Sequence, residues 1–136
     1  MAQELKVARS TVVNGGGVSV GGVTETVTAD HVLTFSKEIP ANSTDEHLVG
    51  PDITLAICNA MAIVANKDCV VKTNSSSSPT DTLTLLANKA IHWLTGDPAA
   101  NKFLTATVTD WYITTGADQT IIKMVFAMDA TPNLGG

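Results

Sequence analysis

Histidine and acidic side chains are the first candidates for catalysis in this sequence, because together they can supply a general base and a group that orients it. The histidines are His31, His47 and His92, and only His47 has acidic neighbours, in the run Asp45-Glu46-His47. Catalysis also requires a nucleophile and an oxyanion-binding group at the same place. No sequence pattern brings such groups together, so we predict a solvated loop at residues 45–47, no catalytic residues and no enzyme activity.

Cofactor and metal motifs are the next candidates. The Gly15-Gly16-Gly17 tract is neither a phosphate-binding loop nor a dinucleotide fingerprint, and no Asp-x-Asp-x-Asp calcium loop occurs. Cys58 and Cys69 are the only cysteines, and their spacing does not match a zinc site. We favour free thiols in the core over a disulfide. We therefore expect no metal, no cofactor and no small-molecule substrate.

Three aromatic residues, Trp93, Trp111 and Tyr112, allow two interpretations. Displayed together on a flat surface, they would form a stacking platform for a carbohydrate. Placed in the core or at a subunit contact, they would bury a large apolar area. Because aromatic residues make up only 4% of the chain, we favour core or interface positions.

The amino-acid composition and charge exclude some classes of binding partner. The 136 residues are 44% hydrophobic and 15% charged, with a net charge of −5, as expected for one folded domain. The eight lysines and arginines are scattered, so we expect no nucleic-acid binding. No segment has the length of a membrane span, and the first residues lack a signal-peptide pattern, so we expect synthesis in a cytosol and no membrane association.

The elements that position these residues are predicted to be short β-strands. Runs rich in Val, Ile and Thr are separated by Gly, Pro, Asn and Asp about every ten residues, which is typical of an all-β sandwich or barrel. We predict strands at residues 18–28, 31–39, 60–65, 69–73, 82–86, 90–94, 103–114 and 119–128. Residues 5–13 are a candidate strand or an extended arm. Residues 53–58 are ambiguous between a strand and a short helical turn.

Three short polar connections, at residues 66–68, 87–89 and 115–118, predict tight turns, with β-hairpins around the first and the last. The Ser-rich tract at 75–78 is predicted to be a surface crossover between two strands. In the last strand, Ile122, Met124, Phe126 and Met128 should face the core. Ile121, Lys123 and Val125 then lie on the other face, either partly exposed or at an interface.

Together these features predict a two-sheet antiparallel β-sandwich, jelly-roll-like, with about eight or nine strands and minimal helix. Residues 1–17 are interpreted as an extended N-terminal arm with a Gly-rich joint, and residues 18–136 as the single sandwich domain. The arm offers candidate partner-binding residues, Leu5, Val7, Val12 and Val13.

Residues 60–129 resemble a recurrent pattern in small virion proteins of tailed bacteriophages. A hydrophobic strand and a polar turn precede Val-Val-Lys-Thr-Asn-Ser-Ser-Ser-Ser-Pro-Thr-Asp-Thr, which is followed by a Leu-rich strand, Lys-Ala-Ile-His-Trp and a closing strand pair ending in Asp. The segment Glu-Ile-Pro-Ala-Asn-Ser-Thr-Asp at residues 38–45 also fits.

The resemblance implies a β-sandwich that decorates and stabilises the outer capsid surface as a cement protein. It further implies the major capsid protein as partner, a homotrimer, and location on the virion after synthesis in the host cytoplasm. Two alternatives stay open: a structural component of the tail tube, fibre or baseplate, and a carbohydrate-binding or adhesion module.

Overall fold

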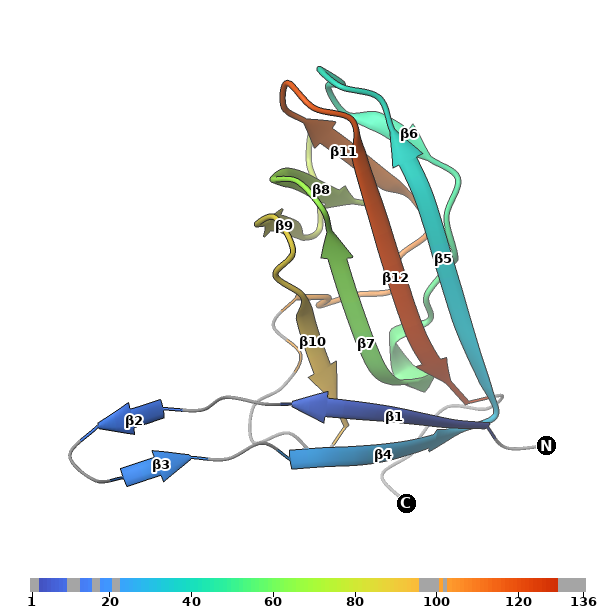
Figure 1. The fold of residues 1–136 in the computed structure, drawn as a ribbon. Helices are drawn as coiled ribbons and strands as arrows, with labels where there is room; N and C mark the ends of the chain where they lie inside the picture. The colour runs from blue at the N-terminus through green and yellow to red at the C-terminus, as the bar shows by residue number, and fades with distance from the viewer. Residues whose placement is uncertain are drawn as a thin grey trace.

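The protein is an all-β sandwich preceded by a long β-hairpin (Figure 1). The computed structural model describes residues 3–9, 13–15, 18–20, 23–95, 101 and 103–129, with side chains described from Ala29 onward. The strands are β1 Gln3–Arg9, β2 Val13–Gly15, β3 Val18–Val20, β4 Val23–Ala29, β5 His31–Ile39, β6 Glu46–Leu48, β7 Cys58–Ala65, β8 Cys69–Thr73, β9 Thr82–Leu85, β10 Ile91–Leu94, β11 Trp111–Thr115 and β12 Thr120–Met128. One 3-10 turn, η1 Leu55–Ile57, resolves the ambiguity at residues 53–58.

Eight of these strands form the sandwich, as the sequence predicts. The first sheet has the order β10-β7-β12-β5, and the second sheet has the order β6-β11-β8-β9. All pairs in both sheets are antiparallel. From β5 to β12 the chain changes sheet at every connection except the one between β8 and β9. That order is the topology of a jelly roll.

The core lies between the two sheets and follows the alternation read from the sequence. In β12, Ile122, Met124, Phe126 and Met128 are all buried, which confirms their predicted direction. Trp111 of the second sheet packs against Phe126 of the first, with 6.2 Å between ring centroids. The Trp111 indole N–H donates to the Pro51 carbonyl at 2.9 Å, so the polar group of this buried ring has a hydrogen-bond partner.

The prediction of hairpins at the short connections is wrong. Residues 66–68 join β7 in the first sheet to β8 in the second, and residues 116–119 join β11 in the second to β12 in the first. The predicted tight turn at 87–89 lies in a third such corner, between β9 and β10. Three extended residues span about 10 Å, which is also the distance between packed sheets, so a short connection suits a corner as well as a hairpin.

Polar side chains at these corners bind neighbouring corners. Asp68 accepts a hydrogen bond from the backbone N–H of Ala87 at 2.8 Å, and the N–H of Asn88 donates to the Ala65 carbonyl at 2.7 Å. At the connection between β5 and β6, the Thr115 hydroxyl donates to the Pro40 carbonyl at 2.6 Å. The turn-forming residues therefore close the end of the sandwich through contacts distant in sequence.

The Ser-rich tract belongs to the one connection that stays within a sheet, so its prediction as a crossover is also wrong. Residues 74–81 join β8 to β9, which pair directly. Asn74, at a positive φ of 69°, donates to the Thr107 carbonyl and accepts from the Thr109 N–H. Asp81 accepts from both the N–H and the hydroxyl of Thr105. The loop is thereby fixed against residues 105–109.

The predicted strand at 103–114 is shorter in the structure. β11 begins at Trp111, and Val108 makes an isolated bridge with Ile53. The intervening backbone is bonded to Asn74 and Asp81 instead of to a neighbouring strand. Side-chain acceptors here compete with ladder formation, which is typical of Asn and Asp.

Candidate interaction surfaces

The N-terminal residues form a β-hairpin that reaches beyond the sandwich. β1 pairs with β4 from Gln3↔Ala29 to Arg9↔Val23, and β2 pairs with β3 from Val13↔Val20 to Gly15↔Val18. The predicted arm is therefore one strand of a hairpin whose other strand continues into β5. Figure 1 shows β1 and β4 running crosswise to the sandwich strands, with β2 and β3 beyond the edge strand β10. We call β2 and β3 the tip.

Of the candidate partner-binding residues, Leu5 and Val7 lie in β1 and Val13 lies in the tip. Val12 lies outside the described residues. Because residues of a strand alternate between its two faces, the pairing puts Leu5 and Val7 on the same face as Ala29.

The base of the hairpin sits on the outer face of the first sheet. Ala29 is buried in a small apolar cluster with Ala60, Leu94 and Ala127, separate from the main core. The last three occupy one row across β10, β7 and β12. We call this row the seat. Its alanines leave room for the hairpin backbone to approach closely, which large side chains would prevent.

Above the seat, the outer face of the first sheet carries half-buried apolar side chains on β7 and β12, flanked by the exposed His92 of β10 and by exposed Thr34, Ser36 and Glu38 of β5. Ala62, Val64, Ile121 and Val125 are half-buried, and Lys123 among them is exposed. The sequence prediction for Ile121, Lys123 and Val125 thus identified part of this face. It missed Ala62 and Val64, because their place beside β12 depends on the pairing of β7.

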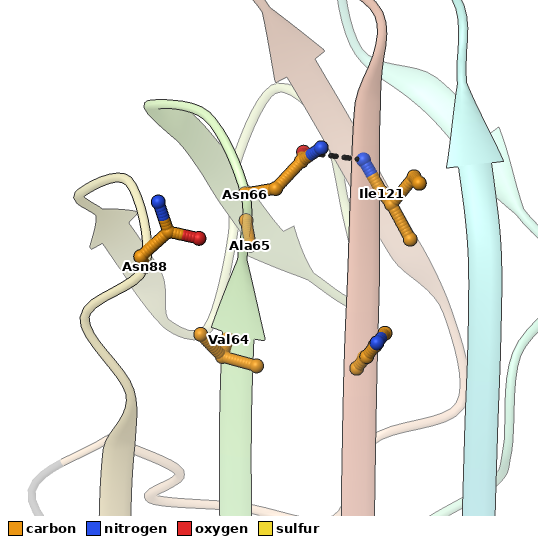
Figure 2. Close-up of a pocket in the computed structure, with 6 residues that line it drawn as sticks. Val64, Ala65, Asn66, Asn88 and Ile121 are labelled. Carbon is orange, nitrogen blue, oxygen red and sulfur yellow. Dashed lines mark hydrogen bonds between the residues drawn. The ribbon is translucent and has the colours of Figure 1, made fainter.

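Two shallow hollows flank Lys123 on this face. One, of about 270 Å³, is lined by Val64, Asn66, Asn88 and Ile121 (Figure 2). Its rim is fixed because the Asn66 side-chain oxygen accepts the Ile121 N–H at 2.8 Å, the bond drawn in the figure. The other, of about 250 Å³, lies towards β5 and includes Thr34 and Val125.

The outer face of the second sheet is polar. A row of Thr82, Lys72, Tyr112 and His47 crosses β9, β8, β11 and β6. The His47 and Tyr112 rings lie 5.1 Å apart, and Lys72 pairs with Asp45 at 3.0 Å. Lys72 and Asp45 are half-buried at the surface, where an ion pair adds little stability.

His47 does meet an acid, although not one of its sequence neighbours. Its Nε2 lies 3.1 Å from Asp110 Oδ1, and both side chains are well exposed. The Thr109 hydroxyl donates to the other oxygen of the same carboxylate at 3.0 Å. In a catalytic triad the hydroxyl would bond the imidazole, whereas here both groups bond the acid. His31 and His92 lie in β5 and β10 of the other sheet.

The three aromatic candidates are separated. Trp111 is fully buried in the core, Trp93 is half-buried in β10 of the first sheet, and Tyr112 is half-buried on the outer face of the second. Three residues with these positions do not share one surface. A carbohydrate platform built from all three is therefore incompatible with the fold.

Both cysteines are buried free thiols. Cys58 begins β7 and its thiol donates to the Ala60 carbonyl, while Cys69 begins β8 in the other sheet. Burial raises the pKa of each thiol to about 11, with the negative charge of Asp68 adding to the effect at Cys69. Neither is a reactive thiolate near neutral pH.

No group of three His, Cys, Asp or Glu that could hold a metal occurs in the described part of the chain. Within residues 3–129, apart from the gaps given above, no helix is long and apolar enough to cross a membrane. Comparisons with protein-family models, curated proteins and solved structures found no match for this chain.

Proposed function

We propose that the protein is a structural component of a bacteriophage virion that binds the outer capsid surface and links neighbouring subunits. The observation that carries the proposal is the hairpin, whose tip lies beyond the body's own edge strand (Figure 1). The resemblance of residues 60–129 to small virion proteins supports the same role. In this role the major capsid protein is the partner, and the virion surface is the location.

The size of the hairpin supports a linking role. Seven residues at about 3.3 Å each make β1 and β4 about 23 Å long, whereas four strands about 4.8 Å apart span only about 14 Å. The hairpin is thus longer than the sheet is wide, and the tip extends it further. In this role the hairpin reaches a neighbouring capsid subunit, while the body stays bound to the first capsid subunit.

The body has properties that suit a protein required to resist mechanical load. Its core is continuous between the sheets, and its corners are bonded to one another by Asp68, Asn88 and Thr115. Many copies on a symmetric shell convert modest single contacts into strong total binding. The mechanism is therefore a clamp against expansion of the packaged shell, with no chemical step.

The deciding experiment is to locate the chain in intact particles by electron cryomicroscopy. We expect density on the outer capsid surface where subunits meet. Density on the tail would favour a tail component instead, and absence from the particle would overturn the proposal.

The role of the hairpin is tested separately by a shortened variant in which Asn-Gly replaces residues 10–22. Asn-Gly forms a two-residue turn, and Arg9 and Val23 are already paired, so β1 and β4 remain joined. We expect capsid occupancy to fall. Unchanged occupancy would remove the hairpin from the mechanism while leaving the body's role intact.

A carbohydrate-binding role has one supporting observation, the adjacent His47 and Tyr112 rings on the polar face. A glycan array followed by calorimetry on the full chain and on Tyr112→Ala would distinguish it. Saturable binding that Tyr112→Ala abolishes would favour an adhesion module, whereas a capsid-binding protein should give no saturable response.

A further inference from the structure

Strand β5 is the longest free edge of the sandwich among the described residues. The first sheet ends in β10 and β5, and the second sheet ends in β6 and β9. β5 has nine residues, whereas β6 has three and β9 and β10 have four each. A free edge offers its backbone N–H and C=O groups to a strand of another molecule, and a short edge limits such pairing. β5 is therefore the edge most open to pairing between copies of this chain.

The backbone of β5 has no feature that would block such pairing. The strand contains no proline, and its nine residues pair with β12 in one continuous register without a bulge. Leu33 and Phe35 are half-buried and pack against the main core from this edge. A second β5 strand laid alongside would cover more of both side chains, so burial of apolar surface favours pairing. Any protection of this edge must come from its other side chains.

Lys37 interrupts the apolar inner side of this edge. It lies opposite Ile122 of β12, which is fully buried in the core. Because alternate residues of a strand share a face, Lys37 lies on the same inward side as Phe35 and Ile39. Ile39 is buried, whereas Lys37 is exposed. Lys37 borders a hollow of about 380 Å³ lined by residues of β5 and β6, including the exposed Glu46. A lysine thus occupies a core-facing position at the open side of the sandwich.

We propose that Lys37 prevents the β5 strands of two copies from pairing. Opposing residues of an antiparallel pair share a face, and both are hydrogen-bonded or both are not. In two paired β5 strands, Lys37 is therefore always opposite an inward-facing residue of the second copy, which is apolar, His31 or another Lys37. Among the described residues no carboxylate forms an ion pair with Lys37, so water solvates its ammonium group. Pairing would remove that water, and burying an unpaired charge is costly. The device belongs to the isolated protein and does not depend on the proposed role on a capsid.

The first test compares the molar mass of the purified full chain with that of Lys37→Val, by light scattering during gel filtration over a range of concentrations. We expect the variant to reach twice the mass of the wild-type species, because two β5 edges that pair with each other form a closed, two-fold contact. Its association should be tighter than that of the wild type by about tenfold or more. Ser36→Val adds the same side chain at the adjacent outward-facing position, and Lys37→Glu keeps a charge at the inward position. Both controls should keep the wild-type mass.

The second test locates the contact by hydrogen exchange of single backbone amides, followed by NMR. Alternate N–H groups of an edge strand point away from its neighbour, so alternate amides of residues 33–39 should exchange rapidly in the wild-type chain. Lys37→Val should protect this rapid set and leave β8 and β11 unchanged. Three results would each overturn the proposal: a wild-type mass for Lys37→Val, equal association of Ser36→Val or Lys37→Glu, or association of Lys37→Val without added protection in β5.

Discussion

The sandwich body and the N-terminal hairpin are both β-structure, but they are held together by different interactions. In the body, two four-stranded sheets enclose Trp111, Phe126 and other side chains that are fully buried. In the hairpin, β1 pairs only with β4, and the tip strands pair only with each other. Hydrogen-bond ladders are present in both regions, whereas the large enclosed apolar core belongs to the body.

This contrast indicates where stability and function reside. Burial of apolar surface is the dominant favourable term in folding, and a backbone ladder alone contributes little net free energy. The body therefore folds by its own core, and the base of the hairpin is held by the packing of Ala29 on the seat.

The strongest test of the contrast is to remove a core side chain from the body. Phe126→Ala should lower the free energy of unfolding by about 3–5 kcal/mol, because it leaves a cavity beneath Trp111. Urea unfolding monitored by tryptophan fluorescence measures the loss. A loss below about 1 kcal/mol would mean that the core between the sheets is not the main source of stability.

The buried Cys58 thiol gives a pH-dependent test of the same core. Its pKa is about 11 when folded and 9.0 when exposed, so its contribution is complete below pH 9 and is lost as pH rises towards 11. The expected loss is about 2–3 kcal/mol by pH 11. Measuring the free energy of unfolding against pH for the wild-type chain and for Cys58→Ala isolates the effect of this thiol. Identical pH profiles of the two proteins between pH 9 and 11 would contradict the prediction.

A smaller effect is expected where the two regions meet. Leu94→Ala should cost about 2 kcal/mol, because Leu94 is buried in the seat, in a cluster small enough to collapse partly. Hydrogen exchange should speed up in β1 and β4 more than in β8 or β11. Uniform acceleration across the chain would indicate that the hairpin and the body unfold as one unit.

The smallest effect is expected at the tip. The variant in which Asn-Gly replaces residues 10–22 should change the body's free energy of unfolding by less than about 0.5 kcal/mol, when measured where the wild-type chain is monomeric. The tip lies beyond β10, past the edge of the first sheet (Figure 1). A larger loss in urea unfolding would show that the tip contributes to the stability of its own body.

The fold class was predictable because alternation of side chains is a local property. The buried positions of β12 follow directly from the period of two in its sequence, and the predicted bounds of β8, residues 69–73, are those of the structure. The same alternation predicted that Ile121, Lys123 and Val125 lie on the outward face of the strand. What it could not supply was the strand beside them, which brings Val64 to the same surface.

The sequence predictions that were wrong concern the connections between strands. Residues 66–68 have hairpin chemistry, yet β7 and β8 lie in different sheets, and the eight-residue Ser-rich loop connects two strands that do pair. The arm prediction had a similar origin: the sequence gives no local sign that Leu5 will pair with Val27. In each case the deciding contact is with residues distant in the chain, such as Asp68 with Ala87 or Asn74 with Thr109.

The sequence by itself determined that this chain is all-β, which residues of the last strand face the core, and that Cys58 and Cys69 are buried thiols, because these depend on residue type and on a period of two. Only the tertiary structure decided the jelly-roll order, the corners, and the meeting of the hairpin with Ala60, Leu94 and Ala127. The physical reason is that a short polar connection spans the distance to a neighbouring strand and the distance to the facing sheet equally well. Which of the two it does is settled by the packing of the whole core.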